Sequence, residues 1–180
     1  LIATPAAAAD HLSNDVGKDL KAAQDAMKAG DFATAMTQIK AAQAFPNRTP
    51  FDDFTINRLL AAAAASQRDF ATAATAYDAV IPSPYFADVD PTEQKSDYHN
   101  AIIIDQSTQR WSQVIEYGQK LEALKGLDDV TMTIMAVAYY QTKDNANAQK
   151  YAQMAIDAAK AAGKEPQPNA TIILGNIQGT

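Results

Sequence analysis

The chain has 180 residues, a net charge of −6 and no cysteine. Its length suits a single domain, and the lack of cysteine excludes disulfide bonds and thiol chemistry. The negative charge, with no run of basic residues, argues against a nucleic-acid partner because it would repel a phosphate backbone.

The first two expected helices follow a capping sequence near the start of the chain. Ser13 and its neighbours offer side-chain oxygens for a helix over residues 14–29, in which apolar residues recur at helical spacing. Gly30 then interrupts the pattern, and Asp31 can cap a second helix that ends before Pro46. The two helices together predict an antiparallel hairpin.

A five-residue sequence from the start of this second helix occurs again further along. The residues Asp31–Ala35 read Asp-Phe-Ala-Thr-Ala, and Asp69–Ala73 read the same. A repeat of about 40 residues has the length of one helical hairpin, which cannot bury its apolar face alone and must stack on its neighbours. The repeat therefore predicts a row of similar hairpins.

The same start and stop signals divide the rest of the chain. Thr49-Pro50 and Asp90-Pro91 each combine a capping residue with proline at the first helical position, and Asp128 can cap a later helix. Further helices are expected over residues 50–66, 70–81, 91–106, 111–125, 129–142 and 145–162. Phe32, Phe70 and Trp111 take equivalent places in the turns, where we expect them to pack between hairpins.

Two segments fall outside the regular hairpins. Residues 82–91 form the longest expected loop and carry Tyr85 and Phe86, either as an apolar plug between hairpins or as a contact for a partner. Residues 166–180 read as the start of a further helix or as a terminal tail. The expected domain plan is thus a flexible lead-in over residues 1–13, a repeat domain over residues 14–165, and this last segment.

The first ten residues leave the compartment open. Their small residues of the Ala-x-Ala kind follow Leu1 and Ile2, as at the end of an export signal, but they equally suit an Ala- and Pro-rich lead-in of a cytoplasmic protein. The longest apolar stretch, residues 59–65, is too short for a bilayer, which requires about 20 residues. We therefore predict no membrane insertion.

The hairpin sequences resemble the second half of the tetratricopeptide repeat. The residues that carry the resemblance in the first unit are Gly30-Asp31-Phe32, Ala35, Ile39 and Ala42. The second unit keeps Asp69-Phe70, Ala73 and Tyr77, and the third and fourth units match less completely. The resemblance implies an all-α, right-handed superhelix, or solenoid, of about four hairpins.

In that family the first helix of each hairpin lines a concave groove that binds a peptide or a partner protein. The resemblance places Leu20, Gln24, Arg58, Ala62, His99, Ile103, Gln106, Thr133, Val137 and Tyr140 at groove positions. Of these, the predicted partner-binding residues are Gln24, Arg58, His99, Gln106, Thr133 and Tyr140. The lysine and asparagine that one subset of the family uses to clamp a terminal carboxylate are absent from the matching positions, so we do not predict that clamp.

The sequence offers no residue pattern for catalysis. His11 and His99 are far apart, and the aspartates at helix starts are explained by capping. Asp88 and Asp90 lack the glycine and the distal glutamate of a calcium loop. We therefore predict a non-enzymatic interaction scaffold without cofactor or metal, and, as the alternative, a module that forms homodimers by stacking its C-terminal end on a second copy.

Overall fold

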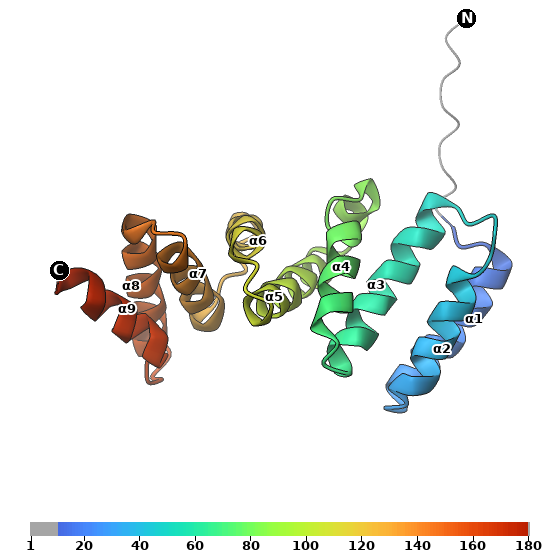
Figure 1. The fold of residues 1–180 in the computed structure, drawn as a ribbon, viewed down its shortest axis with the longest axis horizontal. Helices are drawn as coiled ribbons and strands as arrows, with labels where there is room; N and C mark the ends of the chain where they lie inside the picture. The colour runs from blue at the N-terminus through green and yellow to red at the C-terminus, as the bar shows by residue number, and fades with distance from the viewer. Residues whose placement is uncertain (1–10, 180) are drawn as a thin grey trace, which may run out of the picture. The chain divides into compact units, whose positions relative to one another are not determined.

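The described part of the chain, residues 11–179, is all-α in the computed structural model (Figure 1). Residues 1–10 of the expected lead-in lie outside this range. The helices are α1 (Asn14–Lys28), α2 (Phe32–Gln43), α3 (Pro50–Ser66), α4 (Phe70–Val80), the 3₁₀ helix η1 (Pro84–Asp88), α5 (Pro91–Ser107), α6 (Trp111–Ala123), α7 (Asp129–Gln141), α8 (Asn145–Ala161) and α9 (Pro168–Gln178). None of these helices has the length and apolar character that crossing a membrane requires.

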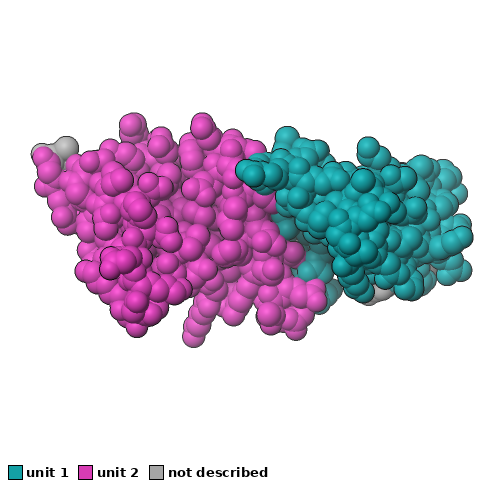
Figure 2. All heavy atoms as spheres, turned by 90° about the horizontal axis from the view of Figure 1, so that it is seen from below, with its two compact units in different colours: residues 1–89 teal, residues 90–180 magenta. Residues whose placement is uncertain are grey.

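The chain divides into two compact units (Figure 2). Unit 1 comprises residues 1–89 and unit 2 residues 90–180, so the boundary falls inside the single repeat domain that we expected over residues 14–165. Each unit has its own helices and its own packing, and the two are described separately below.

Unit 1 contains two helical hairpins. Helix α1 packs along α2, and α3 packs along α4. The hairpins meet through α2 and α3, and the two first helices, α1 and α3, also touch. This is the neighbour-to-neighbour packing of a helical repeat. Helix η1 follows α4 and ends the unit.

Unit 2 by itself has the same kind of helix packing, with an added helix. The hairpins are α5 with α6 and α7 with α8, and α9 packs on α8 and α7. The first helices α5, α7 and α9 therefore contact one another in sequence order. Helix α9 takes the place that the first helix of a further hairpin would occupy, in the segment where the sequence suggested such a start.

All four hairpins share one turn geometry. The residue two positions before each second helix has a positive φ, and the residue between them is the N-cap, with φ between −88° and −82° and ψ between 66° and 76°. The backbone N–H of that N-cap donates to the carbonyl oxygen five residues earlier, closing the end of the first helix. The positive-φ residues are Gly30, Arg68, Gln109 and Lys143. This common turn confirms the repeat that the sequence predicted.

Aspartate caps the second helix in three of the four hairpins. The carboxylates of Asp31, Asp69 and Asp144 each accept a hydrogen bond from a backbone N–H three residues on. Bonds from the same downstream residues lower the pKa of all three carboxyl groups. In the third hairpin Arg110 stands at the N-cap and makes no such bond.

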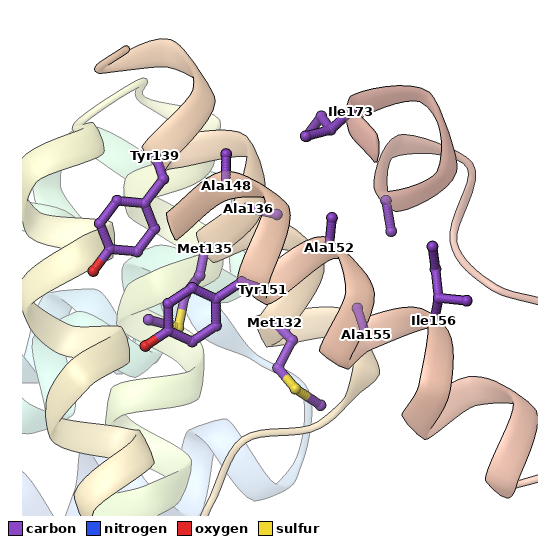
Figure 3. Packing of buried hydrophobic residues seen from close by; sticks show 11 residues of the cluster. Met132, Met135, Ala136, Tyr139, Ala148, Tyr151, Ala152, Ala155, Ile156 and Ile173 are labelled. Atoms are coloured by element: carbon purple, nitrogen blue, oxygen red, sulfur yellow. The ribbon is translucent and has the colours of Figure 1, made fainter. Parts of the chain in front are cut away.

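The apolar core of each unit lies between its helices. In unit 1 the buried cluster comprises Val16, Leu20, Ala23, Ile39, Ala42, Ile56 and Ala63. In unit 2 a buried cluster lies among α7, α8 and α9 (Figure 3), and its residues are Met132, Met135, Ala136, Tyr139, Ala148, Tyr151, Ala152, Ala155, Ile156, Ala170 and Ile173. Alanine at so many buried positions allows the helices to approach closely.

The turn aromatics lie less deeply than the sequence led us to expect. Phe32, Phe70 and Trp111 are each the first residue of their helix and are only half-buried. A side chain at the very end of a helix covers the end of its hairpin, whereas the middle of the interface is filled by residues further along, such as Ile39 and Tyr77.

A buried carboxylate joins the starts of α1 and α3. Asp52, which is 0% exposed, accepts hydrogen bonds from the backbone N–H and the hydroxyl of Ser13, at 2.9 and 2.6 Å. It also accepts the backbone N–H of Thr49 at 2.8 Å, while its own N–H donates to the Thr49 hydroxyl. Burial alone would raise the pKa of Asp52, but these hydrogen bonds together hold it below 3.8.

We expect Asp52→Asn to lower the free energy of unfolding by about 1–3 kcal/mol at pH 7, because the amide cannot accept all the bonds of the carboxylate. A lowered carboxyl pKa contributes stability that is complete above the unfolded value of 3.8 and is lost as the pH falls through the folded value. The difference between the two proteins should therefore shrink toward pH 2. Urea unfolding at pH 7 and at low pH measures this difference in unfolding free energy between the native protein and Asp52→Asn. An equal difference at both pH values would show that the charge of Asp52 does not contribute to stability.

Candidate partner-binding surfaces

The predicted partner-binding residues are divided between the two units. Gln24 lies on α1 and Arg58 on α3, both in unit 1. The others lie on the first helices of unit 2: His99 and Gln106 on α5, Thr133 and Tyr140 on α7. The candidate surfaces are therefore those that each unit forms by itself.

On α1 the two groove positions differ in their surroundings. Gln24 is exposed, as a partner-binding side chain must be. Leu20, which the resemblance also placed in the groove, is only 2% exposed and belongs to the core of unit 1. Leu20 is therefore a packing residue, because it lies on the same face of α1 as Val16 and Ala23, which meets α2 and α3.

Arg58 lines a pocket between α3 and η1, and we call it the aromatic pocket. Its volume is about 480 Å³. Three rings meet there: those of Phe51 and Tyr85 lie edge to face with centroids 5.2 Å apart, and Phe54 is 6.2 Å from the first and 5.8 Å from the second. The full lining is Phe51, Phe54, Thr55, Arg58, Tyr85, Asp88 and Val89.

The loop after α4 supplies one wall of this pocket. Its η1 segment buries Phe86, which is 4% exposed, and leaves Tyr85 half-buried against the rings of α3. The two aromatic residues of the loop thus have different surroundings. The burial of Phe86 resembles the plug that the sequence suggested, whereas Tyr85 is placed where it could touch a ligand.

His99 of unit 2 faces the start of α7. Its Nε2 atom lies 3.4 Å from a carboxylate oxygen of Asp128, the residue that caps α7. Burial acts to raise the pKa of Asp128, but hydrogen bonds from Thr131 and the charge of His99 outweigh it and lower that pKa. His99 therefore links α5 to the start of α7, and part of its side chain remains exposed to solvent.

The other predicted residues of unit 2 differ in accessibility. Thr133 is 6% exposed, and its hydroxyl donates to the backbone carbonyl oxygen of Asp129 at 2.7 Å, so it lies in the core and presents little surface. Gln106, near the end of α5, is half-buried. Tyr140 is also half-buried and lies in a surface depression beside α9.

This depression, which we call the α7–α9 groove, has a volume of about 260 Å³. Its apolar part comes from both helices and includes Ile172, which is 56% exposed. Three carboxamide side chains stand around it. The full lining is Val137, Tyr140, Gln141, Asn169, Ile172, Ile173 and Asn176. Tyr140 and Val137 were groove positions in the sequence, so two of the expected residues meet in one hollow.

Neither depression has a histidine or cysteine side chain in its lining. Among the described residues no group of three or more histidine, cysteine, aspartate or glutamate side chains is placed to hold a metal ion. The aromatic pocket contains one carboxylate and one guanidinium group, and the α7–α9 groove has no charged side chain in its lining. Both are suited to recognising apolar groups flanked by polar ones.

From the sequence, the loop that forms η1 was expected to be either a plug or a partner contact, but no residue of η1 or α9 was among the predicted partner-binding residues. The aromatic pocket depends on Tyr85 and Asp88, and the groove depends on Ile172 and Asn176. The available signals were two adjacent aromatic residues in a proline-bearing loop and an apolar run after Pro168. Both marked the segments, but neither indicated which helix each would pack against.

The fold of the described residues defines an all-α protein of the helical-repeat class, built from hairpins that share one turn geometry. No family model matches the chain, and no curated protein matches it. Among solved structures, it is similar to a tetratricopeptide repeat protein from Parabacteroides merdae, at 14% identity and a TM-score of 0.35. That match covers 92% of this chain and 86% of the other.

Proposed function

We propose that the chain is an interaction scaffold that binds an extended segment of a partner protein in the α7–α9 groove. The observation that carries this proposal is the meeting of Tyr140, Val137 and Ile172 in a hollow between two first helices. Stacked helical hairpins commonly present extended binding surfaces of this kind. An apolar side chain of the partner would enter the hollow.

The carboxamides at the edge of the groove favour an extended backbone. Gln141, Asn169 and Asn176 are exposed, and each offers both a donor and an acceptor. An extended segment has free N–H and C=O groups that match this pattern, whereas a helix satisfies its own backbone groups. The volume of about 260 Å³ is below the usual range of small-molecule pockets, which begins at about 300 Å³, and suits a side chain of a passing segment.

Charge also favours a particular kind of partner. The chain carries a net charge of −6, and the groove lining is uncharged. A segment with an apolar residue at its centre and basic residues on either side would be attracted by the field of the chain without burying an unpaired charge. Gln24 and Arg58 stay proposed as partner contacts of unit 1, and Gln106 and His99 as partner contacts of unit 2.

The test uses an array of acetylated, amidated decapeptides with a central leucine or phenylalanine and flanking lysines. For the peptide that binds most tightly, we expect Tyr140→Ala to weaken binding about tenfold through lost contact area. Asn176→Ala should weaken it about two- to tenfold through a lost hydrogen bond. Gln149→Ala, which changes an exposed amide on α8, serves as the control and should leave affinity unchanged.

A second set of peptides separates backbone recognition from simple apolar contact. Methylation of the backbone nitrogens next to the central residue removes their N–H donors. It should lower the affinity of the native protein for the peptide by a larger factor than it lowers the affinity of Asn176→Ala. Calorimetric titration gives both affinities. Peptides that bind Tyr140→Ala and Asn176→Ala as tightly as the native protein would show that the groove is not the site.

Self-association is the second candidate, and exposed Ile172 is the observation that favours it. At 56% exposure it is the large apolar side chain that α9 leaves open to solvent. Two copies could cover it by stacking their α9 helices. Ala170 and Ile173 of the same helix are buried, so deleting α9 would damage the core, and a point substitution is the better probe.

Sedimentation equilibrium of the native protein and of Ile172→Lys distinguishes the two candidates. A native dimer that becomes monomeric on substitution would support self-association. A native monomer whose state is unchanged by the substitution would exclude this route.

A further inference from the structure

We infer that the aromatic pocket of unit 1 binds an aromatic ring that carries a hydrogen-bond donor, of the indole or phenol class. This is a second site, in a different unit from the α7–α9 groove and with different chemistry. It involves η1, which follows the second hairpin in the chain and belongs to no hairpin.

The three rings of the pocket are arranged to accept a fourth. Phe51 and Tyr85 lie edge to face at an interplanar angle of 75°, and Phe54 is tilted at 32° and 44° to them. Phe54 is 8% exposed and forms the floor, while the other two are half-buried and form walls. Aromatic pairs prefer edge-to-face and offset arrangements at about 4.5–7 Å, so a ligand ring can contact an edge and a face at once.

The size of the hollow fits a compact ring system. Its volume of about 480 Å³ lies in the range of about 300–1,000 Å³ found for small-ligand pockets. The lining is mostly apolar and aromatic, with Val89 beside the rings and three polar side chains among them. This is the composition by which such pockets hold an apolar body and orient it through a few polar groups.

The polar groups select a donor on the ligand. Asp88 is exposed, and its carboxylate can only accept hydrogen bonds. The Thr55 hydroxyl already donates to the carbonyl oxygen of Phe51 at 2.9 Å, which leaves it as an acceptor. An indole N–H or a phenol O–H can donate to one of these oxygens in place of water. A plain hydrocarbon ring offers them no donor.

The guanidinium group of Arg58 favours an aromatic ring over a cation as the ligand of this pocket. Rings with a nearby carboxylate can also hold an alkylammonium group by cation–π attraction. A guanidinium in the lining opposes a second positive charge, whereas its planar face attracts an electron-rich ring. This contact uses the face of the group and is compatible with hydrogen bonds that Arg58 makes in its plane.

The experiment titrates the full chain into 5-fluoroindole and follows the ¹⁹F resonance of the probe. We expect a saturable shift. Tyr85→Leu, which keeps apolar bulk but removes a ring, should weaken binding about fivefold or more, and so should Asp88→Ala. Gln149→Ala, which alters an exposed side chain on α8 of unit 2, is the matched control and should bind the probe as the native protein does. Circular dichroism of each variant checks that its helices remain.

Two further probes test whether the ligand needs an N–H donor and whether the pocket excludes a cation. The N-methylated form, 5-fluoro-1-methylindole, lacks the N–H and should bind several times more weakly than 5-fluoroindole. Tetramethylammonium should not displace the probe. Displacement by it, equal binding of the two indoles, or unchanged binding to Tyr85→Leu would each overturn the inference.

The source of the ring is resolved by comparing a free molecule with a side chain. If the capped tripeptide Ac-Gly-Trp-Gly-NH₂ binds and its leucine analogue does not, the ring comes from a partner protein. If 5-fluoroindole binds and the tripeptide does not, the ligand is a small aromatic compound. Binding of neither refutes the inference and leaves the α7–α9 groove untouched, because Tyr85 and Asp88 do not line that groove.

Discussion

We expect Leu20→Ala to lower the free energy of unfolding of unit 1 by about 2–5 kcal/mol. The side chain is 2% exposed and packs with Val16, Ile39 and Ile56, so its removal loses buried apolar surface and leaves a cavity. Because helices of a repeat depend on their neighbours, the loss should appear as faster amide exchange throughout α1 to α3.

The matched control is Gln24→Ala, one turn further along the same helix. Gln24 is exposed, and its substitution by a better helix former should change the unfolding free energy by no more than about 0.5 kcal/mol. Hydrogen exchange with mass spectrometry and urea unfolding compare the two variants. A Leu20→Ala protein as stable as Gln24→Ala would mean that Leu20 faces the groove, as the family resemblance had placed it.

We expect Tyr151→Ala to lower the unfolding free energy of unit 2 by about 3–5 kcal/mol. Tyr151 is 3% exposed and stacks on Tyr139 with centroids 5.4 Å apart and planes at 7° (Figure 3). Its hydroxyl donates to the carboxylate of Glu122 on α6 at 2.6 Å, and Lys150 lies over its ring. One side chain thus joins three helices.

The variant Tyr151→Phe separates the ring from the hydroxyl. It keeps the stack but loses the bond to Glu122, and it should cost about 1–3 kcal/mol. Burial and the neighbouring Glu122 raise the pKa of Tyr151, so the hydroxyl stays protonated and able to donate up to strongly alkaline pH. Thermal unfolding followed by circular dichroism ranks the proteins. If Tyr151→Phe costs as much as Tyr151→Ala, the ring stack contributes little.

The helices could be predicted from the sequence because their end signals are local. Thr49-Pro50 and Asp128 cap helices where expected, and each forms a capping box. The repeated Asp-Phe-Ala-Thr-Ala sequence marks two identical turns, and the weaker third and fourth copies adopt the same backbone angles. A turn is defined by a few adjacent residues, so its sequence is sufficient to find it.

The surfaces could be predicted only in part because they depend on which helix faces which. The family resemblance placed Tyr140 at a groove position, and the structure has it beside α9. The same resemblance placed Thr133 and Leu20 on the surface, whereas both are buried. A shift of one residue along a helix turns a side chain by about 100°, so an approximate register is enough for the fold but not for a binding face.

The neighbour-only packing within each unit also bears on how quickly the protein folds. Every hairpin brings together helices that are adjacent in the chain, and the first helices meet the first helices of the next hairpin. The mean sequence separation of contacting residues, or contact order, is therefore small. Chains of low contact order spend little entropy on closing long loops before favourable contacts form, and they fold in microseconds to milliseconds. A nascent hairpin can thus pack on the hairpin before it without waiting for the rest of the chain to be synthesised.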